Sequence, residues 1–246
     1  MPWTDRQFQQ HCTAARLLDH VRTTVWEFLR HHPGTTERAV QEFALQQFRR
    51  CRLRLDHDQP IVAFREHTAE VHYFPPRRGS SRLRSNSWVL LDLWARLDQP
   101  RAPYADITWM AYRGRAVPAS LAHGFTAVRS ARDLALDFLR REVAAGRRPK
   151  GSAVDAVARR SLNRAGFRGA FLHTLGHSLG LNHPHGTPGG FSPRHGHPIT
   201  AGIGYTIEPG VYLPGRFGAR LEMDCFITSD RQVIVTTELQ REVVRV

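Results

Sequence analysis

Two aspartates in the first half of the chain stand in apolar stretches that are typical of strands. Asp92 lies in the run Trp88–Trp94, and Asp106 lies 14 residues further on, in the run Tyr104–Tyr112. An ionised carboxylate in such a strand is costly unless it is paired or binds a metal ion. Their midpoint, Gln99, falls in a turn sequence. We therefore predict an antiparallel hairpin in which the two carboxylates face each other, with Cβ atoms about 5 Å apart and a divalent cation between them.

Two glutamates in the second half repeat this arrangement. Glu208 and Glu222 are also 14 residues apart, each in an apolar stretch, and their midpoint is Gly215 in a Pro-Gly turn sequence. Two acidic pairs in two halves of the chain indicate a symmetric cage of four carboxylates. Four carboxylates would balance the formal charge of two divalent cations.

A histidine is the expected fifth ligand. The chain has 14 histidines, and many of them lie between His173 and His197. We favour His177, because it follows a predicted strand and a glycine and can therefore project into a cleft. One imidazole with four carboxylates suits Mn, Co, Fe or Zn better than Ca, which prefers oxygen ligands alone. The chain contains no His-Glu-x-x-His sequence, which excludes the zincin type of site.

The elements that must position these residues occur in the same order twice, as two helices followed by strands. This predicts an α+β fold with an internal duplication, in one domain over residues 1–246, with halves at about 1–115 and 116–246. The expected helices cover about 17–32, 36–48, 121–146 and 152–166. The expected strands cover 61–74, 88–94, 104–112, 170–173, 205–213, 220–228 and 232–236.

Composition narrows the class of protein. The net charge is +13, but Lys150 is the only lysine and the arginines are scattered through every segment. We therefore do not expect nucleic acid as a partner, since its binding sites concentrate basic residues. No apolar run approaches the ~20 residues of a membrane span, and no signal peptide is recognisable. The three cysteines are widely spaced and predicted to be free thiols, which favours the cytoplasm.

These motifs together resemble the pita-bread metallopeptidases, which include aminopeptidase P, prolidase, methionine aminopeptidase and the non-peptidase creatinase. The resemblance covers about residues 15–240, and all five ligand types occur in the family's order. The Glu-Pro-Gly-x-Tyr and Arg-x-Glu sequences are most similar to the aminopeptidase P and prolidase branch. The matching segments are Leu91-Asp92-Leu93, Ala105-Asp106-Ile107-Thr108, Gly176-His177-Ser178-Leu179-Gly180, Ile207-Glu208-Pro209-Gly210-Val211-Tyr212 and Arg220-Leu221-Glu222.

The resemblance implies a pita-bread fold and a role for each ligand. Asp92 would chelate one metal ion, His177 and Glu208 the other, and Asp106 and Glu222 would bridge the two. Manganese is the favoured metal, with cobalt, zinc and iron as alternatives. A hydroxide held between the metals would attack the peptide carbonyl, and Glu208 would shuttle the proton.

The resemblance also implies residues that contact the substrate. His72 matches a substrate-facing catalytic histidine of the proline-specific members, and Arg220 matches the arginine beside the second glutamate. The second such histidine normally stands seven residues after the metal ligand, where this chain has Pro184. We expect His185 to take that role, with its neighbour His183 as the alternative.

Two further departures bear on the substrate. The gap between Asp92 and Asp106 is three residues longer than usual, and the extra N-terminal domain of aminopeptidase P and prolidase has no counterpart in this sequence. The expected function is an aminopeptidase that cleaves Xaa-Pro bonds of a peptide substrate, with homodimer formation left open. The alternatives are a pseudo-enzyme that binds peptide, protein or nucleic acid, and a creatinase-like hydrolase of a small C–N substrate.

Overall fold

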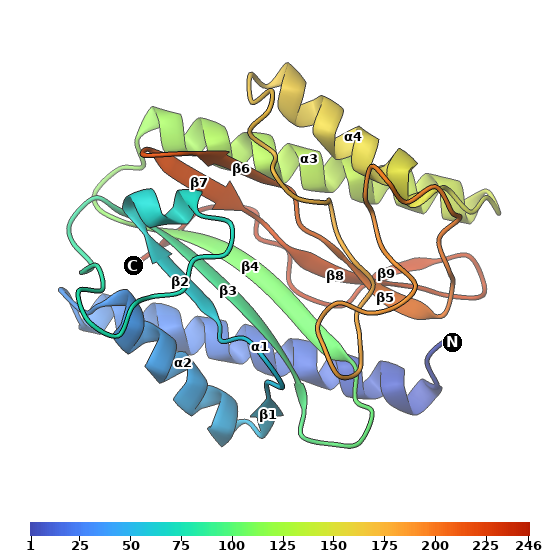
Figure 1. Cartoon of the computed structure of the whole chain (residues 1–246), viewed down its shortest axis with the longest axis horizontal. Coiled ribbons are helices and arrows are strands. Elements are labelled where there is room, and N and C mark those ends of the chain that lie inside the picture. The colour runs from blue at the N-terminus through green and yellow to red at the C-terminus, as the bar shows by residue number, and fades with distance from the viewer.

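Two pairs of helices lie on opposite sides of the β-structure (Figure 1). The computed structural model describes residues 1–246, and its order of two helices followed by strands occurs twice, as predicted. The first pair is α1 (Asp5–His31) and α2 (Glu37–Arg50), and the second pair is α3 (Ala119–Ala144) and α4 (Gly151–Arg164). None of the four combines the length and apolar character that a membrane-spanning helix needs.

The strands form two sheets and one separate hairpin. The first sheet has the order β1-β3-β4-β10, with β2 also paired to β3, and the second has the order β5-β8-β9. The hairpin consists of β6 and β7. The bounds are β1 (Leu53–Arg54), β2 (Ile61–Phe64), β3 (Ser87–Leu97), β4 (Tyr104–Arg113), β5 (Ile203–Ile207), β6 (Gly210–Leu213), β7 (Phe217–Arg220), β8 (Met223–Ile227), β9 (Val233–Val235) and β10 (Val244–Arg245).

The long strands β3 and β4 divide the hydrophobic core into two clusters. Odd-numbered residues such as Leu91 and Ile107 pack against α1 and α2. Even-numbered residues such as Leu90 pack toward α3, α4 and the second sheet. Because strand side chains alternate between faces, Asp92 and Asp106 both lie on the face away from α1 and α2.

The strand predicted over residues 61–74 is wrong beyond Phe64. β2 ends there, Arg65 takes a left-handed backbone conformation with φ 53°, and a 3₁₀ helix, η1 (Arg65–Ala69), follows. The buried carboxylate of Glu37 on α2 accepts hydrogen bonds from Phe64 N, His67 Nδ1, Tyr73 Oη and Ser81 N, at 2.7, 2.9, 2.7 and 3.1 Å. This side chain, and not a partner strand, therefore holds the segment.

The strand predicted at residues 170–173 is also wrong. The segment is irregular, and its carbonyl groups are bound by an arginine side chain in place of a neighbouring strand. Arg159 on α4 donates to Phe171 O and His173 O, at 2.9 and 3.0 Å, while it pairs with Asp155. One backbone hydrogen bond connects the segment to β6: Tyr212 N donates to Ala170 O.

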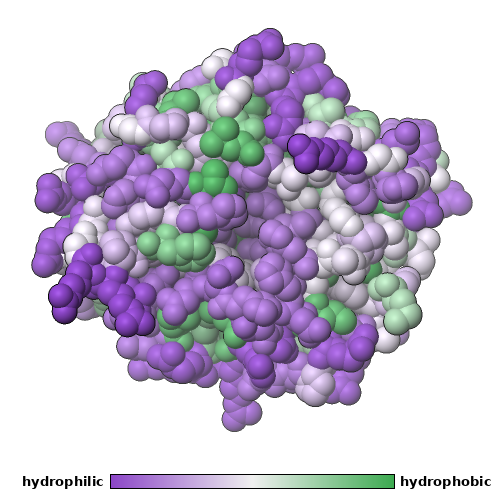
Figure 2. All heavy atoms as spheres, in the orientation of Figure 1, coloured by the Kyte–Doolittle hydropathy of each residue, from purple (hydrophilic) through white to green (hydrophobic).

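The surface is mainly hydrophilic, with apolar patches that are small and separate on the face that Figure 2 shows. Five large apolar side chains are exposed: Met1, Phe74, Leu134, Leu172 and Ile234. They are far apart in the sequence, and only Phe74 lines the cavity described next.

Candidate metal centre

One cavity of about 130 Å³ brings together all nine residues that the sequence predicted for the site. It lies between the even-numbered face of β3 and β4 and the segments that carry His177 and the two glutamates. The predicted residues on its wall are His72, Asp92, Asp106, His177, His183, His185, Glu208, Arg220 and Glu222. The remaining wall is formed by His57, Asp58, Ile61, Phe74, Trp94 and Pro184.

The two aspartates share one face of the hairpin, but they do not stand directly opposite each other. Asp92 pairs with Thr108, and Asp106 pairs with Trp94. The centre of the hairpin is therefore at Pro100 and not at Gln99, because seven residues connect the paired parts of the strands. Moving the centre of the hairpin by one residue changes the pairing partner of each residue by two positions. Both carboxylates therefore stay on the same face.

The two glutamates have the predicted register. Gly210 pairs with Arg220 in the β6–β7 hairpin, and Ile207 pairs with Met223 between β5 and β8, both centred on Gly215. Glu208 and Glu222 fall in the gap between these two ladders. There the backbone of Glu208 donates to Leu175 O at 2.8 Å, and that of Glu222 donates to Thr108 O at 3.0 Å. These two hydrogen bonds connect the glutamates to the segments that carry the predicted ligands His177 and Asp106.

His177 presents one ring nitrogen to the carboxylates. Its Nδ1 donates to Ser178 O at 3.1 Å, so that Nε2 carries no proton and faces the cavity. Nε2 lies 3.4 Å from Glu208 Oε1 and 3.8 Å from Asp106 Oδ2. Ligand atoms of Asp106, His177 and Glu222 all lie within 4.8 Å of one another. This spacing is short enough for one ion to contact all three.

Arg220 organises the other side of the site. Its guanidinium donates to Asp92 Oδ2, to Thr108 Oγ1 at 3.1 Å and to Tyr212 Oη at 3.0 Å. Thr108 in turn donates to Glu222 Oε2 at 2.7 Å. Arg220 is 4% exposed, and so its position is set by these protein acceptors.

The charges of the site favour bound cations. The four predicted carboxylates and that of Asp58 line the cavity, and Arg220 is the only fixed positive charge on its wall. Burial, and then the charge of Glu222, raise the pKa of Asp106 well above its ordinary value. Burial also raises the pKa of Glu208 to about 8 and lowers that of His177 to about 3.

A buried oxygen without a partner adds to this evidence. Asp92 Oδ1 has no hydrogen-bond donor, although buried polar atoms almost always have one. A divalent cation would satisfy that oxygen and would remove the repulsion among the carboxylates. The donor set of carboxylate oxygens and one imidazole nitrogen therefore fits such ions.

The histidines predicted to face the substrate lie at the mouth of the cavity. His72 is exposed on the irregular segment after η1. The ring of His185 lies 4.1 Å from that of His177, whereas the ring of His183 lies 5.2 Å from that of His57. His185 is thus the nearer of the two to the carboxylates, and His183 belongs to the rim.

Two threonines in the site were not predicted. Thr108 links Arg220 to Glu222, and Thr206 Oγ1 donates to Glu208 Oε1 while it accepts from His177 N, both at 3.0 Å. Each threonine stands two residues from a predicted carboxylate ligand, Thr108 from Asp106 within β4 and Thr206 from Glu208 just beyond the end of β5. The alternation of strand faces was therefore a signal in the sequence that could have identified them.

His173 and Tyr212, behind the cavity, were not predicted as site residues, although Tyr212 belongs to the Glu-Pro-Gly-x-Tyr sequence. His173 donates from Nδ1 to Thr174 O, and its Nε2 accepts from Tyr212 Oη at 2.7 Å. Because Tyr212 also accepts from Arg220, the three side chains form a chain of hydrogen bonds that ends at Asp92. These contacts join residues that are far apart in sequence, and only the fold brings them together.

Comparisons with known proteins agree with the fold and identify the family. The sequence model of metallopeptidase family M24 matches residues 9–229. An uncharacterized peptidase of Schizosaccharomyces pombe is 29% identical over 206 residues, which are 83% of this chain and 43% of that protein. The chain thus spans less than half of that relative.

Solved structures match this chain over its whole length. An X-Pro aminopeptidase from Thermotoga maritima has a TM-score of 0.85 at 23% identity, over 100% of this chain and 65% of that one. A dipeptidase from Pyrococcus horikoshii has a TM-score of 0.85 at 27% identity, over 100% of this chain and 64% of that one. The resemblance drawn from the motifs is confirmed: the chain has the pita-bread fold and belongs to metallopeptidase family M24.

Proposed function

We propose that this protein is a metal-dependent aminopeptidase that hydrolyses the first peptide bond of its substrate, with a preference for Xaa-Pro. One observation carries the proposal. All five residues predicted to bind metal line a single cavity, and three of them already lie at the spacing of ligands to one ion. The relatives support the reaction class, and the name of the Thermotoga maritima enzyme supports the preference for proline.

In this proposal two divalent cations occupy the cavity. Asp92 would hold one, His177 and Glu208 the other, and Asp106 and Glu222 would contact both. The cations would supply an activated water and would polarise the carbonyl of the scissile bond. Manganese is proposed as the native metal, and cobalt, zinc or iron would suit the same donors.

The protein's own groups would handle the proton and the substrate. Thr206 occupies Oε1 of Glu208, which leaves Oε2 free to accept a proton and deliver it to the leaving amine. His72 and His185 stand at the mouth, where they would donate hydrogen bonds to the substrate's carbonyl groups. Arg220 would act on the substrate through Asp92, whose carboxylate it orients.

The test combines metal analysis with digestion of matched peptides. Protein loaded with Mn²⁺ is expected to retain about two ions per chain and to release the first residue of Ala-Pro-Gly-Gly faster than that of Ala-Ala-Gly-Gly. Glu208→Gln, which keeps the size of the side chain, is expected to lower kcat by a factor of at least ~10². Arg160→Gln on α4, outside the cavity, is the matched control.

The outcomes are distinct. Retained metal without cleavage of any peptide would refute the peptidase, and a screen of small amides would then test the creatinase-like alternative. Absence of both metal and cleavage would favour a binding pseudo-enzyme. Cleavage without a preference for proline would leave the aminopeptidase standing and overturn the preference.

A further inference from the structure

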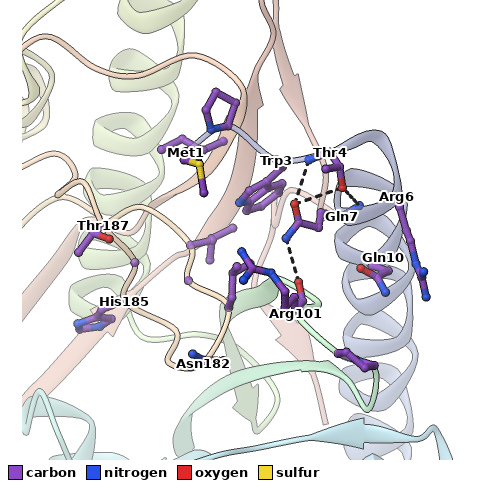
Figure 3. A pocket seen from close by; sticks show the side chains of 17 residues that line it. Met1, Trp3, Thr4, Arg6, Gln7, Gln10, Arg101, Asn182, His185 and Thr187 are labelled. Carbon is purple, nitrogen blue, oxygen red and sulfur yellow. Dashed lines mark hydrogen bonds between the residues drawn. The ribbon is translucent and has the colours of Figure 1, made fainter.

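A second, larger hollow adjoins the metal cavity. It has a volume of about 810 Å³, and we call it the N-terminal groove. Its walls are residues 1–10, the turn between β3 and β4 at Pro100 and Arg101, and the loop 179–187 (Figure 3). His185 lines both the groove and the metal cavity, and is the common wall between them.

Hydrogen bonds between the three segments fix the shape of the groove. Gln7 Nε2 donates to Arg101 O at 3.1 Å, which joins α1 to the turn (Figure 3). Gln10 Nε2 donates to the side chain of Gln99 at 2.7 Å. The loop is joined to β4 through Gly180 O, which accepts from Tyr104 N at 2.9 Å. The groove is therefore a built feature of the fold.

The charge of the groove has one sign. Arg6 and Arg101 are its charged lining residues, and no carboxylate lies among them. Both side chains are exposed, and neither guanidinium is paired with an acidic group of the chain. Arg101 has a left-handed backbone conformation with φ 56°, which is strained for a residue with a side chain. The turn thus presents an unpaired cation to the groove, and Figure 3 shows the side chain of Arg101 among the residues that line it.

The sizes of the two hollows suggest how they are used. Sites for small ligands usually measure about 300–1,000 Å³, a range that includes the groove but not the metal cavity. A peptide with its first residue at the metal centre must therefore leave the small cavity. His185 lines both hollows, so the groove is the space next to the metal cavity on that side.

We propose that the N-terminal groove binds the part of the peptide that follows the scissile bond, and that Arg101, with Arg6, selects peptides with acidic residues there. The proposal rests on the proposed function, because it assumes that a peptide is cleaved in the metal cavity. It adds a substrate class: short peptides with glutamate or aspartate after the third residue.

The test uses two peptides of equal length, Ala-Pro-Gly-Glu-Glu and Ala-Pro-Gly-Gln-Gln, each with an amidated C-terminus. At low salt the metal-loaded protein is expected to cleave the acidic peptide with a kcat/KM about five to ten times higher, mainly through KM. The advantage should shrink at 0.5 M NaCl, because salt screens exposed charges. Arg101→Gln should reduce the ratio of the two kcat/KM values about fivefold, and Arg101→Lys should restore most of it.

A binding measurement gives a readout that does not depend on turnover. A fluorescent peptide with the sequence Gly-Glu-Glu and a blocked N-terminus is titrated with protein in EDTA, and its anisotropy is followed. Wild-type protein and the control Arg160→Gln are expected to bind it equally, and Arg101→Gln with Arg6→Gln about tenfold more weakly.

The outcomes separate this proposal from the function on which it rests. If wild-type protein cleaves both peptides equally, or if Arg101→Gln keeps the full preference, the groove proposal is overturned and the aminopeptidase stands. If neither peptide is cleaved by metal-loaded protein, the proposed function fails and this inference fails with it. A loss of preference in Arg101→Gln but not in Arg160→Gln supports it.

Discussion

Replacement of Glu37 by glutamine should destabilise the protein strongly, although the residue lies outside the metal cavity. Its side chain is fully buried at the start of α2, and its two oxygens accept four hydrogen bonds. Three of the donors, Phe64 N at the end of β2, His67 Nδ1 in η1 and Tyr73 Oη, lie on both sides of His72 in the sequence. Glu37 is therefore the internal support of one wall of the cavity.

The expected magnitude follows from the number of acceptors lost. The glutamine side chain has only one oxygen, and its amide nitrogen is itself a donor. Two of the four groups that donate to Glu37 would therefore face another donor and lose their hydrogen bond. A hydrogen bond to a charged group contributes about 1.5–3 kcal/mol, and loss of two of them gives about 3–6 kcal/mol. That is a large part of the ~5–15 kcal/mol that stabilises a typical domain.

Urea unfolding of metal-loaded Glu37→Gln, followed by circular dichroism, measures the effect. We expect a lower midpoint with an unchanged slope, because the surface exposed on unfolding stays the same. Glu42→Gln is the matched control, since Glu42 lies on the same helix and pairs only with Arg38 at the surface. If Glu37→Gln unfolds within about 1 kcal/mol of wild type, the four hydrogen bonds do not support the segment as argued.

Three further predictions concern the site and α1. Thr108→Val keeps the shape of the side chain but removes the hydrogen bond to Glu222, so metal affinity should fall about 10–100-fold in a metal titration, whereas unchanged affinity would contradict the role of Thr108. Removal of metal with EDTA should lower the melting temperature, because ions that bind only the folded state at 100 times their Kd stabilise it by about 2.7 kcal/mol each; the shift should be much smaller in Glu222→Gln. Burial lowers the pKa of His11 from its ordinary 6.5 to about 4. As the pH falls, His11 therefore binds a proton in the unfolded chain before it does so in the folded chain. The free energy of unfolding is thus unaffected by His11 above pH 6.5 and decreases as the pH falls toward 4. Urea unfolding at pH 7 and pH 4.5 should show a smaller loss in His11→Gln than in wild type, and equal losses would refute the assignment.

That the candidate metal ligands share one cavity could largely be predicted, because strand alternation depends on sequence alone. The apolar neighbours of Asp92 and Asp106 indicated strands, and the even spacing indicated a common face. The register could not be predicted as well, since it depends on how the seven-residue connection around Pro100 closes. The glutamate hairpin was predicted correctly because its Gly215 turn is short and adopts the positive φ that glycine favours.

The incorrect predictions have a common physical cause. Residues 65–74 and 170–173 contain enough apolar side chains to resemble strands, but neither segment forms a ladder with a partner strand. Charged side chains hold both segments: Glu37 accepts from the side chains of His67 and Tyr73, and Arg159 donates to the carbonyl groups of Phe171 and His173. Such pairings join residues that are 12 to 44 positions apart and depend on packing, which local sequence patterns do not describe.

The gap between the two ladders that holds Glu208 and Glu222 also determines where the chain can change length. The same register on both sides of the gap is centred on Gly215, where no other part of the protein lies within 4 Å of the position that a Cβ atom would take. Residues inserted at that tip would lengthen the hairpin outward and leave the glutamates in place. A single residue inserted between Ile207 and Gly210 would reverse the side chains beyond it and break the site. The tip beside Gly215 is therefore the position to choose for an inserted tag, with Gly215 itself kept because of its positive φ.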